Sequence, residues 1–378
     1  MEGLVTGSNA PTTAFWNGRR VFVTGHTGFK GAWLCLWLQR LGAHVAGFSL
    51  PPAAEPNLFD QARVSEGMTS RFGDIRDLED LSRSVADHRA EIILHLAAQA
   101  LVRPSYDDPV GTFLTNVQGT VHVLEAARRS PTTRAVLVVT SDKCYANVGW
   151  EWGYRENDPL GGHDPYSASK ACAEMVAASW RASFATGSAP AIATARAGNV
   201  IGGGDWSVDR LVPDMARAFL GNHPVTLRNP DHVRPWQHVL EPLSAYLCIA
   251  EALCSQPERA SAAWNIGPSQ DHAWPVETLA RQFASDWGDG AQLRVLREGG
   301  QRHEASILML DSSRIRRRLG WSSRWALPRA IAETAAWYRA FRDGDDMRAV
   351  TLDHITRYGR SAITDTPPIP QAALEPTP

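Results

Sequence analysis

A glycine-rich loop near the N-terminus constrains the fold of this chain more than any other feature. The loop reads GHTGFKG over residues 25–31, directly after the apolar run at residues 20–24 and before a helical stretch that is most apolar over residues 32–38. Glycines at this spacing let the backbone approach a pyrophosphate, and the following helix N-terminus supplies amide donors and positive dipole. The context predicts a dinucleotide-binding loop, with a plain strand-to-helix turn as the alternative.

The rest of the chain alternates strand-like and helical segments. The strand-like runs are Arg20 to Thr24, His44 to Phe48, Glu91 to Leu96, Ala135 to Thr140 and Ala191 to Ala195. Intervals of roughly 20 to 45 residues leave room for a crossover helix, as parallel βαβ units require. Because the runs are continuously apolar, we expect both faces of the sheet to be covered. The pattern predicts an α/β fold with a doubly wound parallel sheet, and a last helix near Pro328 to Asp343.

Length and charge exclude several classes of protein. The 378 residues suit one large domain or two interleaved lobes, and a net charge of -2 argues against nucleic acid or an anionic membrane as the main partner. No apolar run reaches the 18 residues of a membrane span, and the first residues lack a signal-peptide pattern. The five cysteines show no zinc-type spacing, so we expect free thiols, no metal site and a cytoplasmic protein.

The basic residues are unusual in kind. Of 38 basic residues, only Lys30, Lys143 and Lys170 are lysines. A chain that uses arginine for almost every positive charge retains lysine where arginine would not serve, because only lysine readily loses its proton. Compositional drift is the alternative, and the motifs decide between the two.

Tyr166 and Lys170 stand at positions i and i+4 of the run YSASK. With 7 tyrosines and three lysines in 378 residues, chance gives about 0.06 such pairs. On a helix the two side chains share one face. We expect the cation to lower the pKa of the tyrosine toward neutrality, so that its phenolate acts as a general base on a hydroxyl group. An exposed structural pair is the alternative.

A second polar motif follows the run at residues 135–140. Ser141 can hydrogen-bond a reacting hydroxyl, and Asp142 and Lys143 offer an acid and a potential base side by side. Because ligands gather at the carboxyl ends of parallel strands, this motif is expected to face the same crevice as the glycine loop. Read alone, Asp-Lys is also an ordinary surface turn.

Two residues bear on the cofactor. Ser49 stands at the end of the second strand-like run, where an NAD-binding Asp or Glu is expected, so this position does not identify NAD. Asp74 could lie near the adenine, or could cap the helix that begins near Leu78.

Taken together, the motifs resemble the extended short-chain dehydrogenase/reductase family and, within it, the CDP-glucose 4,6-dehydratases. The resemblance covers roughly residues 18 to 345 and rests on GHTGFKG, SDKCY, YSASK, Asn116 in NVQGT, GNVIGGGDW and RPWQHVLEP. It implies a Rossmann-type domain at residues 19–198, a smaller α/β C-terminal substrate-binding lobe mainly at 199–345 and interleaved with the first, and tails at 1–18 and 361–378. It also implies a homodimer and bound NAD, with NADP less favoured.

The resemblance assigns residues to both ligands. The residues it assigns to the cofactor are Gly25, His26, Thr27, Gly28, Phe29, Lys30, Gly31, Ser49, Asp74, Ile75, Leu96, Ala97, Ala98, Gln99, Asn116, Tyr166 and Lys170. Those it assigns to a CDP-sugar are Asn199, Val212, Pro213, Leu227, Arg228, Arg234 and Arg302.

The implied reaction is an internal redox dehydration. Tyr166 takes the 4-hydroxyl proton as hydride leaves C4, a base removes the C5 proton, Asp142 protonates the departing 6-hydroxyl, and hydride returns to C6. In related dTDP-glucose enzymes a Glu follows the Asp; here that position holds Lys143, which is either a neutral base or a cation that stabilises the enolate. A nucleotide-sugar 4-epimerase, a dehydratase of another nucleotide sugar, and a cofactor-sensing protein without catalysis are the competing readings.

Overall fold

A central parallel sheet organises the molecule. The computed structural model describes residues 11–184, 189–227, 229–268, 273–296 and 308–361. The sheet has the strand order β11-β6-β5-β4-β1-β2-β3. Its strands are β1 (Arg20–Thr24), β2 (His44–Ser49), β3 (Thr69–Phe72), β4 (Ile92–His95), β5 (Ala135–Val139), β6 (Ala191–Ala197) and β11 (Ala263–Ile266). The order changes direction between β1 and β4, the topological switch point at which doubly wound sheets bind ligands.

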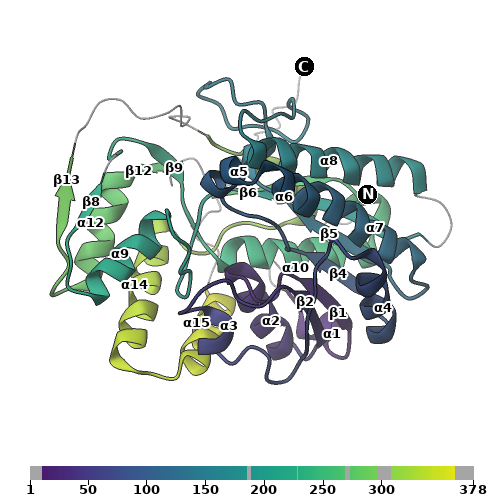
Figure 1. Ribbon diagram of the computed structural model, residues 1–378, viewed down its shortest axis with the longest axis horizontal. Helices are drawn as coiled ribbons and strands as arrows, with labels where there is room; N and C mark the ends of the chain where they lie inside the picture. The colour runs from purple at the N-terminus through teal and green to yellow at the C-terminus, as the bar shows by residue number, and fades with distance from the viewer. Residues whose placement is uncertain (1–10, 185–188, 228, 269–272, 297–307, 362–378) are drawn as a thin grey trace, which may run out of the picture.

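Helices cover both faces of the sheet, as the apolar strands require (Figure 1). Val21 and Val23 of β1 enter one hydrophobic core and Phe22 enters the other. The first core contains side chains of α2 (Phe29–Arg40), α10 (Leu240–Ser255), α14 (Leu327–Asp343) and α15 (Met347–Arg360). The second contains side chains of α4 (Leu78–His88), α7 (Gly119–Arg129) and α8 (Pro165–Phe184).

Helix α2 is buried on several sides, which explains its unbroken apolar sequence. Every residue from Gly31 to Leu38 is buried. Its Trp33 donates a hydrogen bond from Nε1 to the carbonyl of Gly203 at 2.9 Å, and Trp37 packs edge-on against Tyr358 of α15. The helix that follows the glycine loop is thus fixed both to a distant loop and to the C-terminal helix.

Smaller elements complete the fold. Residues after 198 form three two-stranded sheets, β7–β10, β9–β12 and β8–β13, yet they also supply α10 and the edge strand β11 to the main sheet. Helices α9 and α12 and strands β8 and β13 gather at one end of the molecule (Figure 1). The remaining bounds are α1 (Thr13–Trp16), α3 (Leu58–Gln61), α5 (Val102–Asp107), α6 (Pro109–Phe113), η1 (Leu114–Gln118), η2 (Asp142–Cys144), β7 (Val200–Ile201), α9 (Leu211–Leu220), β8 (Val225–Leu227), β9 (Val233–Pro235), β10 (Gln237–His238), α11 (Pro257–Ala260), β12 (Ala273–Pro275), α12 (Val276–Trp287), β13 (Leu293–Val295) and α13 (Ser313–Leu319).

The five predicted strands and the helix near Pro328 to Asp343 are confirmed, whereas β3, β11 and α15 were not predicted. The tail expected at residues 1–18 needs a correction, because Trp16 is fully buried and donates from Nε1 to Glu251 at 2.6 Å. The burial of Trp16 and its hydrogen bond fix the chain just before β1. The expected C-terminal tail lies outside the described residues except for Ser361, and the assignment of 199–345 to a substrate lobe stays a prediction.

Candidate active site

The glycine loop leaves no room for side chains where β1 meets α2. A Cβ on Gly31 would lie 2.0 Å from the Gly25 carbonyl oxygen, and one on Gly25 would lie 2.6 Å from the Ala97 nitrogen. Gly25 also has a φ of 77°, a left-handed conformation that favours glycine. Gly28 begins α2 without a side-chain cap, so the amides of Phe29 and Lys30 in the first turn are open to a ligand.

His26, Thr27 and Ser49 form a polar layer between the loop and β2. His26 is fully buried against Gly47, and its Nε2 lies 2.8 Å from Ser70 Oγ. Burial lowers the pKa of His26 to about 4, so the ring is neutral at pH 7. The Thr27 hydroxyl lies 2.8 Å from Ser49 Oγ and donates to the Leu50 carbonyl. Ser49 therefore lies beside the glycine loop, and its part in binding a cofactor stays a prediction.

Asn116 ties the segment after β4 to helix α8. Its Oδ1 accepts from the Gln99 backbone N–H at 2.8 Å, and its Nδ2 donates to the Gln99 carbonyl and to Ser169 Oγ. The amides of Leu96 and Ala97 donate to Thr24 at the end of β1. Asn116 lies in the π-helical turn η1, an irregularity often found at functional sites. The residues Leu96, Ala97, Ala98 and Gln99 thus follow β4 at the switch point.

Asp74 and Ile75 follow the edge strand β3. Asp74 accepts from both the backbone and the guanidinium of Arg76, and this pairing lowers the pKa of its carboxyl. The cap of the following helix is Asp77, not Asp74, because the Asp77 side chain accepts from the Asp80 N–H. Ile75 is buried and packs against Gly119 of α7.

The motif after β5 and the tyrosine of α8 lie together. Ser141 Oγ donates to Asp142 Oδ1 at 2.9 Å and accepts from the Lys143 backbone N–H at 3.2 Å. The Tyr166 phenol lies close enough to the Ser141 side chain for the serine to lower its pKa in part. Ser141, Asp142 and Tyr166 are 7%, 4% and 8% exposed. The structure therefore brings a phenol, a hydroxyl and a carboxyl into one buried group.

The surroundings of the Asp142 carboxyl act on its pKa in both directions. Burial raises the pKa of the Asp142 carboxyl, and Lys143, Ser141 and Arg234 act in the opposite direction. A carboxyl that retains its proton more firmly than usual is suited to protonate a leaving hydroxyl.

The expected lowering of the Tyr166 pKa is wrong for this structure. Burial raises the pKa of Tyr166 to about 12, while Ser141 and the charge of Arg210 lower it in part. The reason is the direction of Lys170, whose Nζ donates to the Val139 carbonyl at 3.3 Å. The positive charge of an oxidised nicotinamide would be needed to favour the phenolate.

A buried ion pair between Glu174 and Arg196 lies one helical turn beyond Lys170. Glu174 Oε2 accepts from Arg196 at 2.8 Å and from the Thr194 hydroxyl, and Oε1 accepts from Thr140. Burial lowers the pKa of Lys170 to about 8, although Cys144 and Glu174 raise it in part. Sequence reasoning missed Glu174 and Arg196; the i,i+4 spacing from Lys170 to Glu174 was the available signal.

The other two lysines share this neighbourhood. Burial lowers the pKa of Lys30 to about 8, with repulsion by Arg210 and Lys170 adding to it and attraction by Asp142 opposing it. The charge of Lys143 acts on Asp142. Lys30 and Lys143 thus lie near the Asp142 carboxyl and Lys170 lies near Lys30, which favours retention over drift. Arg210, which donates to Asp205 Oδ2 at 2.9 Å, is a further cation that sequence reasoning missed.

Of the residues predicted to bind the sugar nucleotide, some lie near the site, some pack in the core and some lie outside the described residues. Arg234 of β9 lies near Asp142, because its charge acts on that carboxyl. Asn199 follows β6 at the carboxyl edge of the sheet. Val212, Pro213 and Leu227 are buried, and Val212 and Leu227 belong to the main core, so packing alone accounts for them. Arg228 and Arg302 lie outside the described residues.

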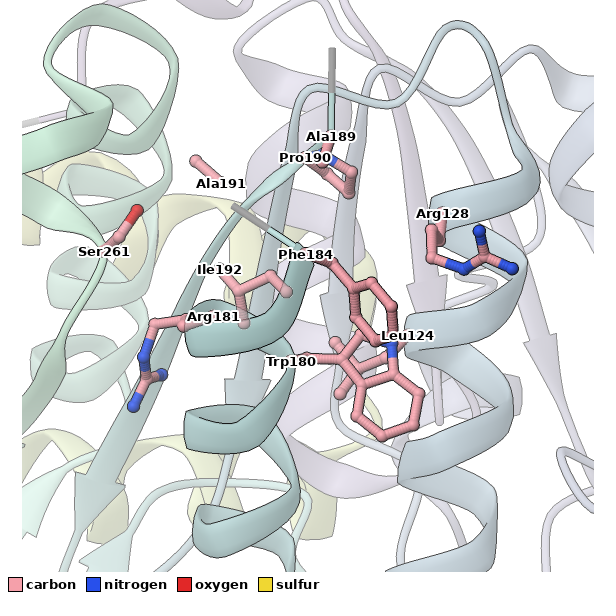
Figure 2. A pocket seen from close by; sticks show the side chains of 10 residues that line it. All are labelled: Leu124, Arg128, Trp180, Arg181, Phe184, Ala189, Pro190, Ala191, Ile192 and Ser261. Atoms are coloured by element: carbon pink, nitrogen blue, oxygen red, sulfur yellow. The ribbon is translucent and has the colours of Figure 1, made fainter. Parts of the chain in front are cut away.

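A cavity of about 220 Å³ elsewhere does not belong to this site. Figure 2 shows that side chains of α7 and α8, with those around the start of β6, line it. The start of β6 lies at the end of the sheet opposite the crevice in which doubly wound folds bind their ligands.

The fit to a dinucleotide rests on the loop itself. Backbone amides at an uncapped helix N-terminus suit a pyrophosphate, and the side chains missing at Gly25 and Gly31 let the backbone come close. Among the described residues, no group of three or more His, Cys, Asp or Glu could hold a metal ion, and no helix has the length and hydropathy of a membrane span.

Comparisons with known proteins agree with this site. Residues 22–334 match the family model described as GDP-mannose 4,6 dehydratase. The CDP-glucose 4,6-dehydratase of Salmonella typhimurium is 48% identical over 91% of this chain and 97% of its own. The dTDP-glucose 4,6-dehydratase of Streptomyces griseus is 29% identical over 85% of this chain and 94% of its own.

Solved structures share the fold. A UDP-glucose-4-epimerase from Stenotrophomonas maltophila with bound NAD and formylated UDP-arabinopyranose superposes with a TM-score of 0.75, at 24% identity, over 86% of this chain and 99% of its own. A likeness at that identity establishes the architecture alone. The matched family and the 48% identity decide between epimerase and dehydratase. The chain belongs to the NAD-dependent nucleotide-sugar 4,6-dehydratases of the extended short-chain dehydrogenase/reductase family.

Proposed function

We propose that this enzyme converts CDP-glucose to CDP-4-keto-6-deoxyglucose and water. The observation that carries the proposal is the buried group of Tyr166, Ser141 and Asp142, with Lys143 next to the acid. An epimerase needs no acid for a leaving hydroxyl, whereas a dehydratase does. The choice of cytidine rests on the similarity to the Salmonella typhimurium enzyme.

Each side chain then has a task. NAD bound at the glycine loop would accept hydride from C4 and return it to C6. Tyr166 takes the proton of the 4-hydroxyl, Asp142 protonates the departing 6-hydroxyl, and Arg234 would hold the diphosphate by bidentate contacts that suit a guanidinium. Lys170 supplies a cation at the base of the site.

The experiment that tests the proposal is incubation with CDP-, dTDP-, UDP- and GDP-sugars, followed by the alkaline absorbance of a 4-keto-6-deoxy product. CDP-glucose is expected to give the highest kcat/KM. Turnover confined to a nucleotide other than cytidine would overturn the substrate assignment. Product without loss of water would overturn the reaction.

We propose Lys143 as the base that removes the C5 proton. It is half-buried, and the described residues give its ammonium group no hydrogen bond or ion pair. Lys143→Met removes both base and charge, whereas Lys143→Arg keeps the charge but cannot act as a base. With a C5-deuterated substrate, both variants are expected to retain the label at C5. Label exchange at the native rate in Lys143→Arg would assign Lys143 an electrostatic role only.

We also propose a cytoplasmic homodimer. All five cysteines are unpaired, as is usual in a reducing compartment. Tyr106 of α5, Val110 and Phe113 of α6, Leu114 of η1 and Met175 of α8 are exposed apolar side chains. Helices α5, α6 and α8 lie side by side in Figure 1. Sedimentation of Val110→Asp is expected to show monomers, whereas Leu296→Asp, at an exposed site just after β13, keeps the dimer. A monomeric wild type would overturn the assembly.

A further inference from the structure

The segment that carries the proposed acid and base has little structure of its own. Asp142 and Lys143 lie in the single turn η2, which two backbone hydrogen bonds of 3.2 Å and 3.3 Å close. A lone turn of this kind is weak, because the hydrogen bonds of a 3₁₀ helix have poor geometry. The positions of both side chains therefore depend on the contacts that hold the chain on either side of η2.

Tyr145 holds the chain directly after η2. It is 2% exposed, and its hydroxyl donates to Asn265 Oδ1 of β11 and accepts from Arg196 Nη1 of β6, both at 2.7 Å. The guanidinium also lies over the Tyr145 ring, with its Cζ 4.9 Å from the ring centroid. Because the hydroxyl has an acceptor and a donor on two neighbouring strands, the residue after η2 is fixed to the sheet.

Thr140 holds the chain directly before Ser141 and η2. Its hydroxyl donates to Glu174 Oε1 at 2.5 Å, and its backbone N–H donates to the Ala195 carbonyl at 2.9 Å. Glu174 lies on α8, one helical turn beyond Lys170. The chain before η2 is therefore fixed to the helix that carries the proposed catalytic tyrosine and lysine.

The ion pair of Arg196 with Glu174 joins these two contacts. Arg196 Nη2 donates to Glu174 Oε2 at 2.8 Å, while Nη1 of the same guanidinium donates to Tyr145. A continuous series of side-chain contacts, through the carboxylate and the guanidinium, therefore runs from Thr140 to Tyr145 and spans η2. The side chains of Glu174 and Arg196 are 1% and 4% exposed, and hydrogen bonds to charged groups are the strong ones.

We propose that Tyr145, with Thr140 at the other end of η2, is a positioning residue that acts through Asp142 and Lys143. Its phenol fixes the end of η2 to Arg196 and thereby sets where the two side chains lie relative to C6 and C5 of the sugar. A displacement of about 1 Å in such a group lowers a rate by about 10²-fold. The assignment rests on the proposed function, in which these two side chains carry out the loss of water.

The oxidation at C4 depends less on Tyr145. Tyr166 and Lys170 lie on α8, and the Lys170 ammonium donates to the Val139 carbonyl, ahead of η2. Removing the phenol oxygen leaves the ion pair between β6 and α8 in place. We therefore expect its loss to slow the elimination of water more than the oxidation, whereas a general loss of structure would slow both steps alike.

The test is Tyr145→Phe in the NAD-loaded enzyme, with Tyr154→Phe as the control. The two rings stack 5.1 Å apart and both residues are 2% exposed, but the Tyr154 hydroxyl bonds to Asn147 and Val148 and not to Arg196. After rapid mixing with CDP-glucose, the absorbance of NADH rises with the oxidation at C4 and falls with the later steps. Both variants are expected to lose similar thermal stability, because each loses one buried hydroxyl.

The two variants are expected to differ in these traces. In Tyr145→Phe the fall of NADH slows by about tenfold or more while its rise stays within about threefold of the wild type, so that NADH accumulates. Tyr154→Phe keeps both rates within about twofold. Equal slowing of the rise and the fall in Tyr145→Phe, or native rates of both, would overturn the positioning role.

A second pair of variants tests the other end of η2 if Tyr145→Phe does not fold. Thr140→Val and Thr194→Val each remove one buried hydroxyl that donates to the Glu174 carboxylate, at Oε1 and Oε2. Only Thr140 lies next to the segment of Asp142. Thr140→Val is expected to accumulate NADH and Thr194→Val is not. Identical NADH traces for the two variants would refute the role of these contacts.

The proposed function and the positioning role fail in different ways. If the wild type forms neither NADH nor a 4-keto-6-deoxy product from any nucleotide sugar, the function fails and the role of Tyr145 fails with it. If another nucleotide sugar proves to be the substrate, the same traces are recorded with that sugar. A wild type that dehydrates its substrate, beside a Tyr145→Phe enzyme with native kinetics, overturns the positioning role alone.

Discussion

Asn116 is joined to Ser169, the residue before Lys170, by a hydrogen bond of 2.8 Å from its Nδ2 to the serine hydroxyl. The same side chain exchanges two hydrogen bonds with the backbone of Gln99. A single buried amide thus sets the position of α8 relative to the segment that follows β4, and the proposed catalytic residues on α8 depend on it.

Replacing Asn116 by Ala is expected to weaken both stability and cofactor binding. The change leaves the Gln99 backbone groups without partners, and each unsatisfied buried group costs about 1–3 kcal/mol. Urea unfolding should show the loss in free energy, and titration with NAD should show a raised Kd. The exposed neighbour Gln118→Ala is the control and should change stability by less than about 0.5 kcal/mol. Unchanged NAD affinity in Asn116→Ala would contradict the positioning role.

Gly31→Ala is expected to abolish NAD binding. The added Cβ would lie 2.0 Å from the Gly25 carbonyl oxygen, so the loop or the helix must move. A matched change, Gly359→Ala in α15, meets no atom within 4 Å and should raise stability by up to about 1 kcal/mol. Calorimetric titration with NAD and thermal unfolding of both variants measure the contrast. Native affinity in Gly31→Ala would refute the close packing of the loop.

Stability is expected to fall as the pH drops from about 6.5 toward 4. Burial lowers the pKa of His26 to about 4 and that of His95 to about 3, while the unfolded values lie near 6.5. In that window the unfolded state binds more protons than the folded state, so stability rises with pH.

The variant His95→Gln removes one side chain that takes up a proton when the protein unfolds in this pH range. The slope of unfolding free energy against pH between 4 and 6.5 should decrease by about 1.4 kcal/mol per pH unit. His223→Gln, at an exposed position, is the control. A slope that His95→Gln leaves unaltered would mean that the ring is protonated in the fold.

Glu174→Gln is expected to destabilise the protein by about 3–5 kcal/mol. Arg196 and Glu174 have side chains only 4% and 1% exposed, and without the carboxylate the guanidinium is buried without an opposing charge. Glu125→Gln removes a partner of the exposed Arg128 instead and should cost no more than about 1 kcal/mol. Similar losses in both variants, measured by urea unfolding, would refute the distinction.

The sequence predicted those parts of the fold that have a simple hydrophobic pattern. The five predicted strands are apolar on both faces, and residues 25–31 have a spacing that only a few structures require. Strand β3 (TSRF) was not predicted because it is a polar edge strand. Strand β11 was not predicted because more than sixty residues of chain separate it from its partner β6.

The sequence predicted which of these side chains lie near one another better than it predicted their pKa values. Motif spacing brings Tyr166 and Lys170 together, but no spacing indicates that the ammonium turns to the Val139 carbonyl and leaves burial to dominate the tyrosine. Arg210 and Glu174 act through tertiary contacts with residues distant in sequence, so their charges could not be placed before the fold was known.

The edge strand β11 also limits how this enzyme can be re-engineered. Since β11 and α10 come from beyond residue 198 but complete the sheet and its cover, a fragment ending there would expose the open edge of β6 and an apolar face. Exchanging whole halves between relatives that act on different nucleotides would therefore also replace β11 and α10, and would set foreign side chains against β6 and the core. Transplanting individual loops at the carboxyl ends of the strands keeps the sheet intact and is the workable route to a new sugar nucleotide.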